Sequence, residues 1–321
     1  MDLSREEPIE ITTMNGSIWI FYHEPIYFPK DPPLDKALWI MNGIFFIICL
    51  LGLVGNGMVI WLLGFRIKRN PFTTYILNLA IADFGVLLFV GSFAVWYAVD
   101  LSRRFWGGYV LLTEVFFFLH CSSAFLLVAI SIDRCMAVLF PLWYRCHKPP
   151  RLSAFVCALI WILSFLIFVL RLIVLMAVND GMFSLKILGT VAAFLCTPLM
   201  VISTLTLFIK VCCKPQQHRR GKLVTVILFT LLFFLIFAFP VNAIYIITFF
   251  NYGNFLLTAL GFICALLNSS INPLIYFLVG RRQKQGRPRV SMEFALQRVF
   301  KDEEGCVEEQ NATAEAQLGA P

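Results

Sequence analysis

Long apolar runs recur along the whole chain and restrict what it can fold into. Hydrophobic residues fill 60% of the 321 positions, and charged residues fill only 14%. About 18–20 apolar residues cross the hydrocarbon core of a bilayer, and a helix satisfies its own backbone groups there. We count seven such runs, at about 38–65, 72–98, 107–140, 152–178, 184–211, 222–250 and 255–279. The sequence therefore predicts an all-α membrane protein, a seven-transmembrane helix bundle.

Lys and Arg are unevenly distributed between the segments that connect these runs. The segments after the first, third, fifth and seventh runs are basic, and the opposite segments are not. Because basic loops stay in the cytoplasm, we expect the N-terminus outside and the C-terminus inside. The net charge of +7 then reflects topology and attraction to anionic membrane lipid, with no nucleic acid as partner.

This orientation divides the chain into three parts. We expect an extracellular arm at 1–36, a seven-transmembrane domain at 37–280 and a cytoplasmic tail at 281–321 with a short amphipathic helix. Asn15-Gly16-Ser17 is a glycosylation acceptor on the outer side. Cys306 follows the amphipathic segment and is either a palmitoylation site or a free thiol.

Several polar residues interrupt the apolar runs. Asp83 lies deep in the second run and must pair, bind an ion or take a proton. Arg134 lies near the end of the third run, where an Arg is either functional or only extends its charge to the interface. Pro273 interrupts the seventh run, and Gly52 and Gly55 permit close helix approach in the first.

Together these residues resemble the motifs of rhodopsin-like G-protein-coupled receptors. The matching positions, in order, are Asn56, Leu79-Ala80-Ile81-Ala82-Asp83, Asp133-Arg134-Cys135, Trp161, Pro198, Pro240 and Asn272-Pro273-Leu274-Ile275-Tyr276. More narrowly, Arg69-Asn70-Pro71-Phe72-Thr73 and Phe140-Pro141-Leu142-Trp143-Tyr144-Arg145-Cys146-His147 resemble the Mas-related receptors. The resemblance implies a multi-pass plasma-membrane receptor that is not an enzyme.

The resemblance also implies how such a receptor would signal. An extracellular ligand binds among the outer helix ends, the sixth helix moves outward at its inner end, and a heterotrimeric G protein enters the opening. Arg134 then lines the cavity, and Leu142 contacts the G protein. The residues assigned to coupling and the switch are Asp133, Arg134, Leu142, Asn272, Pro273 and Tyr276.

A sodium site is implied by the same resemblance. Its five polar positions are matched by Asp83, Ser123, Asn268, Ser269 and Asn272. Allosteric Na⁺ bound there would favour the inactive state, and no other cofactor is expected. The alternative is a hydrogen-bonded polar network without an ion.

The chain departs from the family pattern in places. Tyr109 stands where the third span usually carries a disulfide cysteine, and no Cys lies between Cys157 and Cys196, so we expect no extracellular disulfide. The sixth span has Ala238 in place of the usual Trp and no acid at its cytoplasmic start. Arg134 can therefore pair with Asp133 but not with that span.

Five residues are candidates for binding the ligand: Phe116, Glu114, His120, Arg171 and Lys186. Arg171 and Lys186 stand where Mas-related receptors for cationic ligands carry acids, so we expect a preference for an anionic ligand. The alternative is that Arg171 pairs with Glu114 or extends outward, and that Lys186 only anchors the interface.

Two other classes of function have less support from the sequence. A transporter or channel would favour internal repeats with paired broken helices, which we do not find. An intramembrane enzyme would need a cluster of catalytic groups, and the 4 His are scattered.

Overall fold

The computed structural model describes most of five long helices and isolated positions elsewhere. The described residues are 12–14, 17–19, 32–67, 69–98, 106–140, 144, 149, 151–177, 198–199, 201–202, 205–206, 209, 232, 236, 255–281, 293 and 296. The chain divides into two compact units, Met1–Ile40 and Met41–Pro321.

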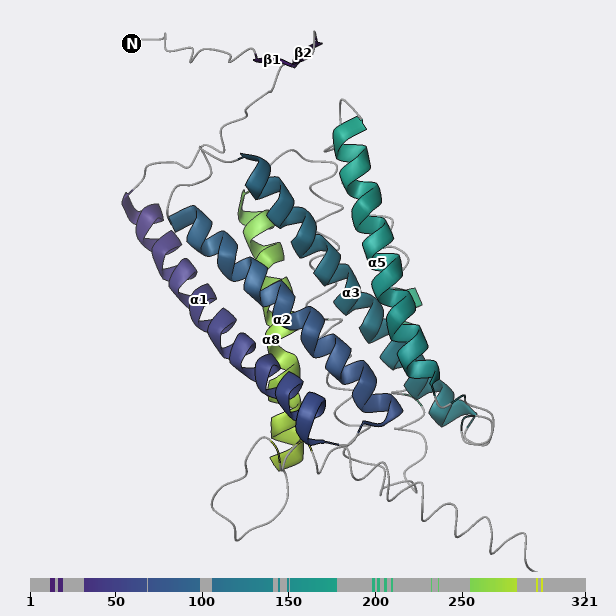
Figure 1. Cartoon of the computed structure of the whole chain (residues 1–321). Helices are drawn as coiled ribbons and strands as arrows, with labels where there is room; N and C mark the ends of the chain where they lie inside the picture. The colour runs from purple at the N-terminus through teal and green to yellow at the C-terminus, as the bar shows by residue number, and fades with distance from the viewer. Residues whose placement is uncertain are drawn as a thin grey trace, which may run out of the picture. The chain divides into compact units, whose positions relative to one another are not determined.

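The first unit contains a small hairpin that the sequence analysis did not anticipate. Strand β1 (Thr12–Met14) pairs antiparallel with β2 (Ser17–Trp19), with Thr12 opposite Trp19 and Met14 opposite Ser17 (Figure 1). The glycosylation acceptor Asn15 lies outside the described residues.

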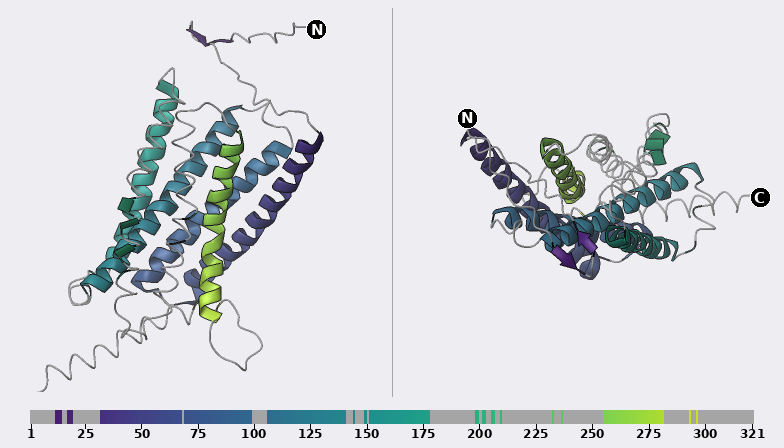
Figure 2. Two further views of the ribbon diagram at one scale, coloured as in Figure 1. Left: turned by 180° about the vertical axis from the view of Figure 1, so that it is seen from behind. Right: turned by 90° about the horizontal axis from the view of Figure 1, so that it is seen from above.

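Five long helices carry most of the described chain: α1 (Pro32–Trp61), α2 (Pro71–Ala98), α3 (Trp106–Leu139), α5 (Leu152–Ala177) and α8 (Phe255–Arg281). Helix α2 contacts α3, α5 and α8, and α3 contacts α5. Seen from above, α2, α3 and α5 form one layer, and α8 lies on one face of it (Figure 2). Since α3 and α5 run in opposite directions (Figure 1), positions early in one lie beside positions late in the other.

The helices agree with the predicted membrane spans. Four apolar stretches are long enough to cross a bilayer, at Gly43–Arg66, Pro71–Ser92, Leu111–Ala137 and Leu152–Ala177, and a shorter one covers Ile263–Leu278. Most of the fifth and sixth predicted spans lies outside the described residues, although the described positions there, from 198 to 236, are helical.

Local chemistry sets two of the helix boundaries. Before α2, the side chain of Asn70 accepts a hydrogen bond from the Thr73 backbone N–H at 2.7 Å, and Thr73 Oγ1 accepts from the Asn70 backbone N–H at 2.8 Å. This reciprocal cap satisfies two backbone donors, and Pro71 fits the first turn. After α1, the chain forms one wide turn, η1 (Leu62–Arg66), and becomes extended at Ile67.

Two glycines bring α1 close to its neighbours, as expected from the sequence. A Cβ atom on Gly52 would lie 2.7 Å from Leu87 Cδ1 of α2 and 2.5 Å from Ser270 Oγ of α8. A Cβ on Gly55 would lie 3.0 Å from Pro273 Cβ. A side chain at Gly52 would therefore force α1 or its neighbours to shift.

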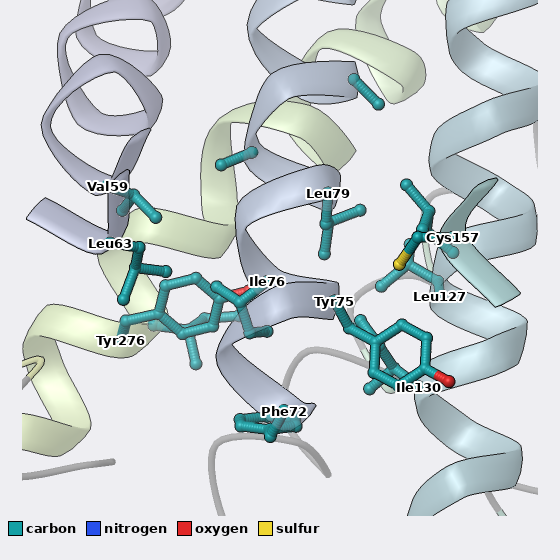
Figure 3. Packing of buried hydrophobic residues seen from close by; sticks show 14 of the residues in the cluster. Val59, Leu63, Phe72, Tyr75, Ile76, Leu79, Leu127, Ile130, Cys157 and Tyr276 are labelled. Atoms are coloured by element: carbon teal, nitrogen blue, oxygen red, sulfur yellow. The ribbon is translucent and has the colours of Figure 1, made fainter. Parts of the chain in front are cut away.

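An apolar cluster fills one end of the bundle. Figure 3 shows Leu63 and Ile76 beside the ring of Tyr276, with Phe72 in the first turn of α2. Tyr75, Ile130 and Cys157 join α2, α3 and α5 on the other side of the same cluster (Figure 3). Leu296 is fully buried in this cluster, and the nearby Glu293 lies 4.0 Å from Arg66.

Candidate functional sites along the helix bundle

The switch candidate Arg134 forms a three-residue polar network near the end of α3. Its Nη2 donates to Asp133 Oδ2 at 2.9 Å and to the hydroxyl of Tyr144 at 3.4 Å. The Tyr144 hydroxyl in turn donates to Asp133 Oδ2 at 2.8 Å. Asp133 and Arg134 are both buried, so the pairing of Arg134 with Asp133 expected from the sequence is present.

Two further contacts fix this network. The guanidinium of Arg134 lies over the ring of Phe72 in α2, 4.3 Å from its centroid, a favourable cation–π geometry. The backbone N–H of Tyr144 donates to the Phe140 carbonyl at 2.9 Å, which ties Tyr144 to the residue that follows α3. Leu142 lies outside the described residues.

The sodium-site candidates form a buried polar cluster between α2, α3 and α8. Ser123 Oγ donates to Asp83 Oδ1 and Asn272 Nδ2 donates to Asp83 Oδ2, both at 2.7 Å. Asp83 and Ser123 are fully buried. All five predicted positions are buried, namely Asp83, Ser123, Asn268, Ser269 and Asn272, and the structure joins three of them, Asp83, Ser123 and Asn272, by direct hydrogen bonds.

Three buried polar groups of α8 have no hydrogen-bond partner within the described part of the chain: Asn268 Nδ2, Ser269 Oγ and the Tyr276 hydroxyl. Buried polar groups normally bind protein or ordered water. Carboxylate and hydroxyl oxygens are the ligands that hard cations prefer, so the residues present fit a small cation with water.

Other motif residues join helices. Asn56 Nδ2 donates to the carbonyls of Gly52 and Ser269, each at 3.0 Å, and so links α1 to α8. Trp161 Nε1 donates to Asn78 Oδ1 at 3.0 Å and links α5 to α2. Pro273 lies inside α8, close to Gly55. These residues hold the bundle around Asp83.

Among the ligand candidates, Glu114 and Arg171 form a bidentate ion pair between α3 and α5. Arg171 Nε donates to Glu114 Oε2 at 2.5 Å, and Nη2 donates to Oε1 at 3.0 Å. The Arg171 side chain is only 7% exposed, and the Glu114 side chain is only 3% exposed. The guanidinium also lies 3.8 Å from the ring centroid of Phe117.

The other ligand candidates lie elsewhere. Phe116 stacks on His120 with centroids 5.8 Å apart, and Phe116 packs in an apolar cluster with residues of α2 and α8. His120 Nδ1 has no hydrogen-bond partner among the described residues. Lys186 lies outside them. The four described candidates therefore form two pairs: Glu114 of α3 with Arg171 of α5, and Phe116 with His120 on α3, where Phe116 packs against residues of α2 and α8.

Sequence reasoning did not assign roles to three residues that contact these sites: Tyr144, Phe72 and Phe117. Phe72 and Tyr144 lie within the stretches that carry the family resemblance. Their place in those stretches was the one sequence feature that could have pointed to a role for them. The position of Phe117 next to two candidate residues gave no sign of its contact with Arg171.

Comparison with known proteins agrees with this arrangement. Residues 55–276 match the model of the 7 transmembrane receptor (rhodopsin family). This stretch runs from Gly55, beside Asn56, to Tyr276, and it contains every residue of the network around Arg134 and of the cluster around Asp83.

Relatives of known name extend the match over most of the chain. Rat proto-oncogene Mas is 37% identical over 286 residues, covering 85% of this chain and 86% of the relative. Human Mas-related G-protein coupled receptor member D is 36% identical over 91% of this chain and 94% of its own length. Mouse Mas-related G-protein coupled receptor member H is 37% identical over 97% of this chain and 95% of its own length. The chain therefore belongs to the rhodopsin family of seven-transmembrane receptors and, within it, to the Mas and Mas-related receptors.

Membership in this family confirms the predicted class of function. The chain is a G-protein-coupled receptor, a multi-pass protein of the plasma membrane, and not an enzyme. An extracellular ligand and a heterotrimeric G protein are its partners. A transporter or channel is not favoured.

Proposed function

We propose that the receptor signals by releasing Arg134 from Asp133 and Tyr144. In this mechanism the N-terminus is extracellular, and the ligand binds at the helix ends far from Arg134. Ligand binding favours a state in which Arg134 lines a cytoplasmic cavity for the G protein, where Leu142 contacts the partner. A ligand shifts such an equilibrium only by its difference in affinity for the two states.

The observation that supports this proposal is the buried network around Arg134. A buried guanidinium is stable only when it is paired and hydrogen-bonded, and Asp133 supplies the charge and a carboxylate oxygen. The described contacts of Arg134 come from Asp133, Tyr144 and the Phe72 ring of α2, and the active state has to replace them with contacts to the G protein. The sixth span has no acid at its cytoplasmic start that could restrain Arg134 in the inactive state, so some ligand-independent activity is expected.

Nucleotide exchange on a purified G protein tests this role. We expect Arg134→Ala, reconstituted in nanodiscs, to lose at least about tenfold in exchange rate because the guanidinium can no longer line the cavity. Surface expression in cells should remain, since the substitution leaves Asp133 able to accept from Tyr144. Exchange by Arg134→Ala at the wild-type rate would refute the assigned role.

We further propose that Asp83 and its neighbours hold one Na⁺ with water. Asp83 supplies the charge, and Ser123, Ser269, Asn268 and Asn272 supply oxygens or orient water. The support is geometric: a fully buried carboxylate needs a compensating charge or proton, and the described cluster gives Asp83 only neutral hydrogen-bond donors, Ser123 and Asn272. Na⁺ bound here would stabilise the inactive arrangement of α2, α3 and α8.

The proposal of an anionic ligand now depends mainly on Lys186. Arg171 already pairs with Glu114, so its charge is compensated, as one alternative from the sequence foresaw. An anion would gain from Arg171 only by displacing the Glu114 carboxylate. Lys186→Glu should therefore reduce the exchange stimulated by an acidic peptide library at least fivefold. Strong activation by a matched basic library, unchanged in Lys186→Glu, would refute an anionic preference.

A further inference from the structure

The ion pair of Glu114 and Arg171 joins two helices at a defined depth. Counted over the whole residue, Glu114 is 2% exposed and Arg171 is 5% exposed. Glu114 precedes Arg134 by about 30 Å along α3, at 1.5 Å per residue. Arg171 lies in the last two turns of α5, which ends at Ala177. The pair therefore occupies the half of the bundle remote from the Arg134 network.

Farther along the α3–α5 interface, the described ring contacts are between aromatic side chains. The Phe118 ring lies 5.8 Å from that of Phe168, 6.4 Å from that of Phe165 and 5.7 Å from that of Trp161. Farther along, Ile130 of α3 and Cys157 of α5 belong to one buried cluster. Residues with higher numbers in α3 contact residues with lower numbers in α5. This is the pattern expected of two antiparallel helices packed in a single register.

Apolar contacts alone discriminate poorly between registers in a membrane. Lipid is as apolar as the helix surfaces, so burying them against each other brings little hydrophobic gain. A slip of one helical turn, about 5.4 Å, would exchange one set of Phe and Leu contacts for another. The same slip would separate Glu114 from Arg171 and leave two unpaired charges in the membrane, which is costly.

We propose that the Glu114–Arg171 ion pair fixes the register of α3 against α5 and thereby positions the ligand-binding half of α3. The bidentate geometry adds directional specificity that a single contact lacks, and setting register is a well-attested use of buried polar groups. Phe117, which packs on the guanidinium, and Phe116 and His120 are held in place with Glu114. The consequence for ligand binding rests on the proposed function, whereas the consequence for helix packing does not.

The positions of the cysteines mean that noncovalent contacts must set the register of α3 against α5 at this end. No cysteine lies between Cys49 and Cys121, and none lies between Cys157 and Cys196. The start of α3 and the segment after α5 therefore cannot be joined by a disulfide. Phe117 and Arg171 also gain from their cation–π contact, which is strongest where water is excluded. Both are positioning residues in this proposal.

Thermal unfolding of the purified receptor in nanodiscs tests the ion pair without ligand or G protein. Glu114→Gln and Arg171→Gln each leave one charge without its partner, and we expect each to lower the melting temperature by roughly 5–10 °C. The charge-reversed double variant, Glu114→Arg with Arg171→Glu, should recover most of this loss. Arg66→Gln is the matched control, because Arg66 pairs with Glu293 at 4.0 Å while 56% exposed, and it should change the melting temperature by no more than about 2 °C.

A second double variant separates register from stability. Glu114→Leu with Arg171→Leu removes both charges, and we expect it to melt within about 3 °C of wild type because no buried charge is left unpaired. Its ligand-independent nucleotide exchange should nonetheless differ at least threefold from wild type, whereas the charge-reversed variant should stay within twofold. Wild-type melting of both single variants would overturn the proposal, as would wild-type exchange by the Leu/Leu variant. If wild type drives no exchange at all, the proposed function fails, and the melting temperatures still judge the ion pair.

Discussion

The hydroxyl of Tyr144 lies 2.8 Å from Oδ2 of Asp133, the same oxygen that accepts a hydrogen bond from Arg134. One carboxylate oxygen of Asp133 thus accepts hydrogen bonds from both the Arg134 guanidinium and the Tyr144 hydroxyl. Because Tyr144 also accepts from Arg134 at 3.4 Å, it contacts both members of the ion pair. The position of Tyr144 is therefore linked to the position of Arg134.

Removing this hydroxyl should make Arg134 easier to release. Tyr144→Phe keeps the ring and deletes both hydrogen bonds of the hydroxyl, one to Asp133 and one from Arg134, a loss of at least about 1 kcal/mol. We expect ligand-independent nucleotide exchange to rise about fivefold. Tyr144→Phe combined with Arg134→Ala should show no such rise, because the effect acts through Arg134. A fall in exchange in the single variant would show instead that Tyr144 supports the active state.

Asp83→Asn should remove the effect of sodium on activity. The substitution deletes the charge that we propose attracts Na⁺, while an amide can still hydrogen-bond to Ser123 and Asn272. In wild type, replacing choline chloride by sodium chloride at constant ionic strength should lower ligand-independent exchange severalfold. Asp83→Asn should show equal rates in the two salts. A wild-type receptor that does not distinguish the salts would favour the ion-free network.

Gly52 should tolerate no side chain without loss of stability. Its Cβ would meet Ser270 Oγ at 2.5 Å and Leu87 Cδ1 at 2.7 Å, so Gly52→Ala overpacks the interface of α1 with α2 and α8. Overpacking costs about 1–3 kcal/mol, and we expect the melting temperature to fall by roughly 3–6 °C. Gly43→Ala, where no atom lies within 4 Å of the added Cβ, is the control and should not be destabilised. Equal melting of the two variants would argue against the close approach.

The sequence predicted the helices directly, whereas the set of residues around Asp83 was implied by the family resemblance. Apolar length alone located the spans, and polar residues deep in such spans, such as Asp83 and Asn272, have few partners other than each other. The hairpin of β1 and β2 was missed although Asn15-Gly16, a dipeptide favoured in hairpin loops, separates the strands in the sequence. The surrounding segment was judged by its polarity and proline content, which outweighed that short signal.

The partner of Arg171 could not be chosen from the sequence. Glu114 was one option, and an incoming ligand was another, because the choice depends on the register of two antiparallel helices. A shift of one turn would give Arg171 a different neighbour without changing the hydrophobic pattern of either helix. The contact between Tyr144 and Asp133 was hidden for a similar reason, since it depends on how the chain turns after Phe140.

Orientation in the membrane can be decided by glycosylation, because the sequence contains only three acceptor motifs. Asn268 is 2% exposed within α8, so it is inaccessible to modification. Asn15 and Asn311 remain, and they lie on opposite sides of a bundle that crosses the membrane seven times. Because the basic connecting segments favour the cytoplasm, we expect glycosidase to shift the mobility of wild type and to leave Asn15→Gln unchanged, as judged by gel electrophoresis. Asn311→Gln is the matched control and should behave as wild type. A shift that is lost in Asn311→Gln and kept in Asn15→Gln would place the N-terminus in the cytoplasm and remove Arg134 from reach of the G protein.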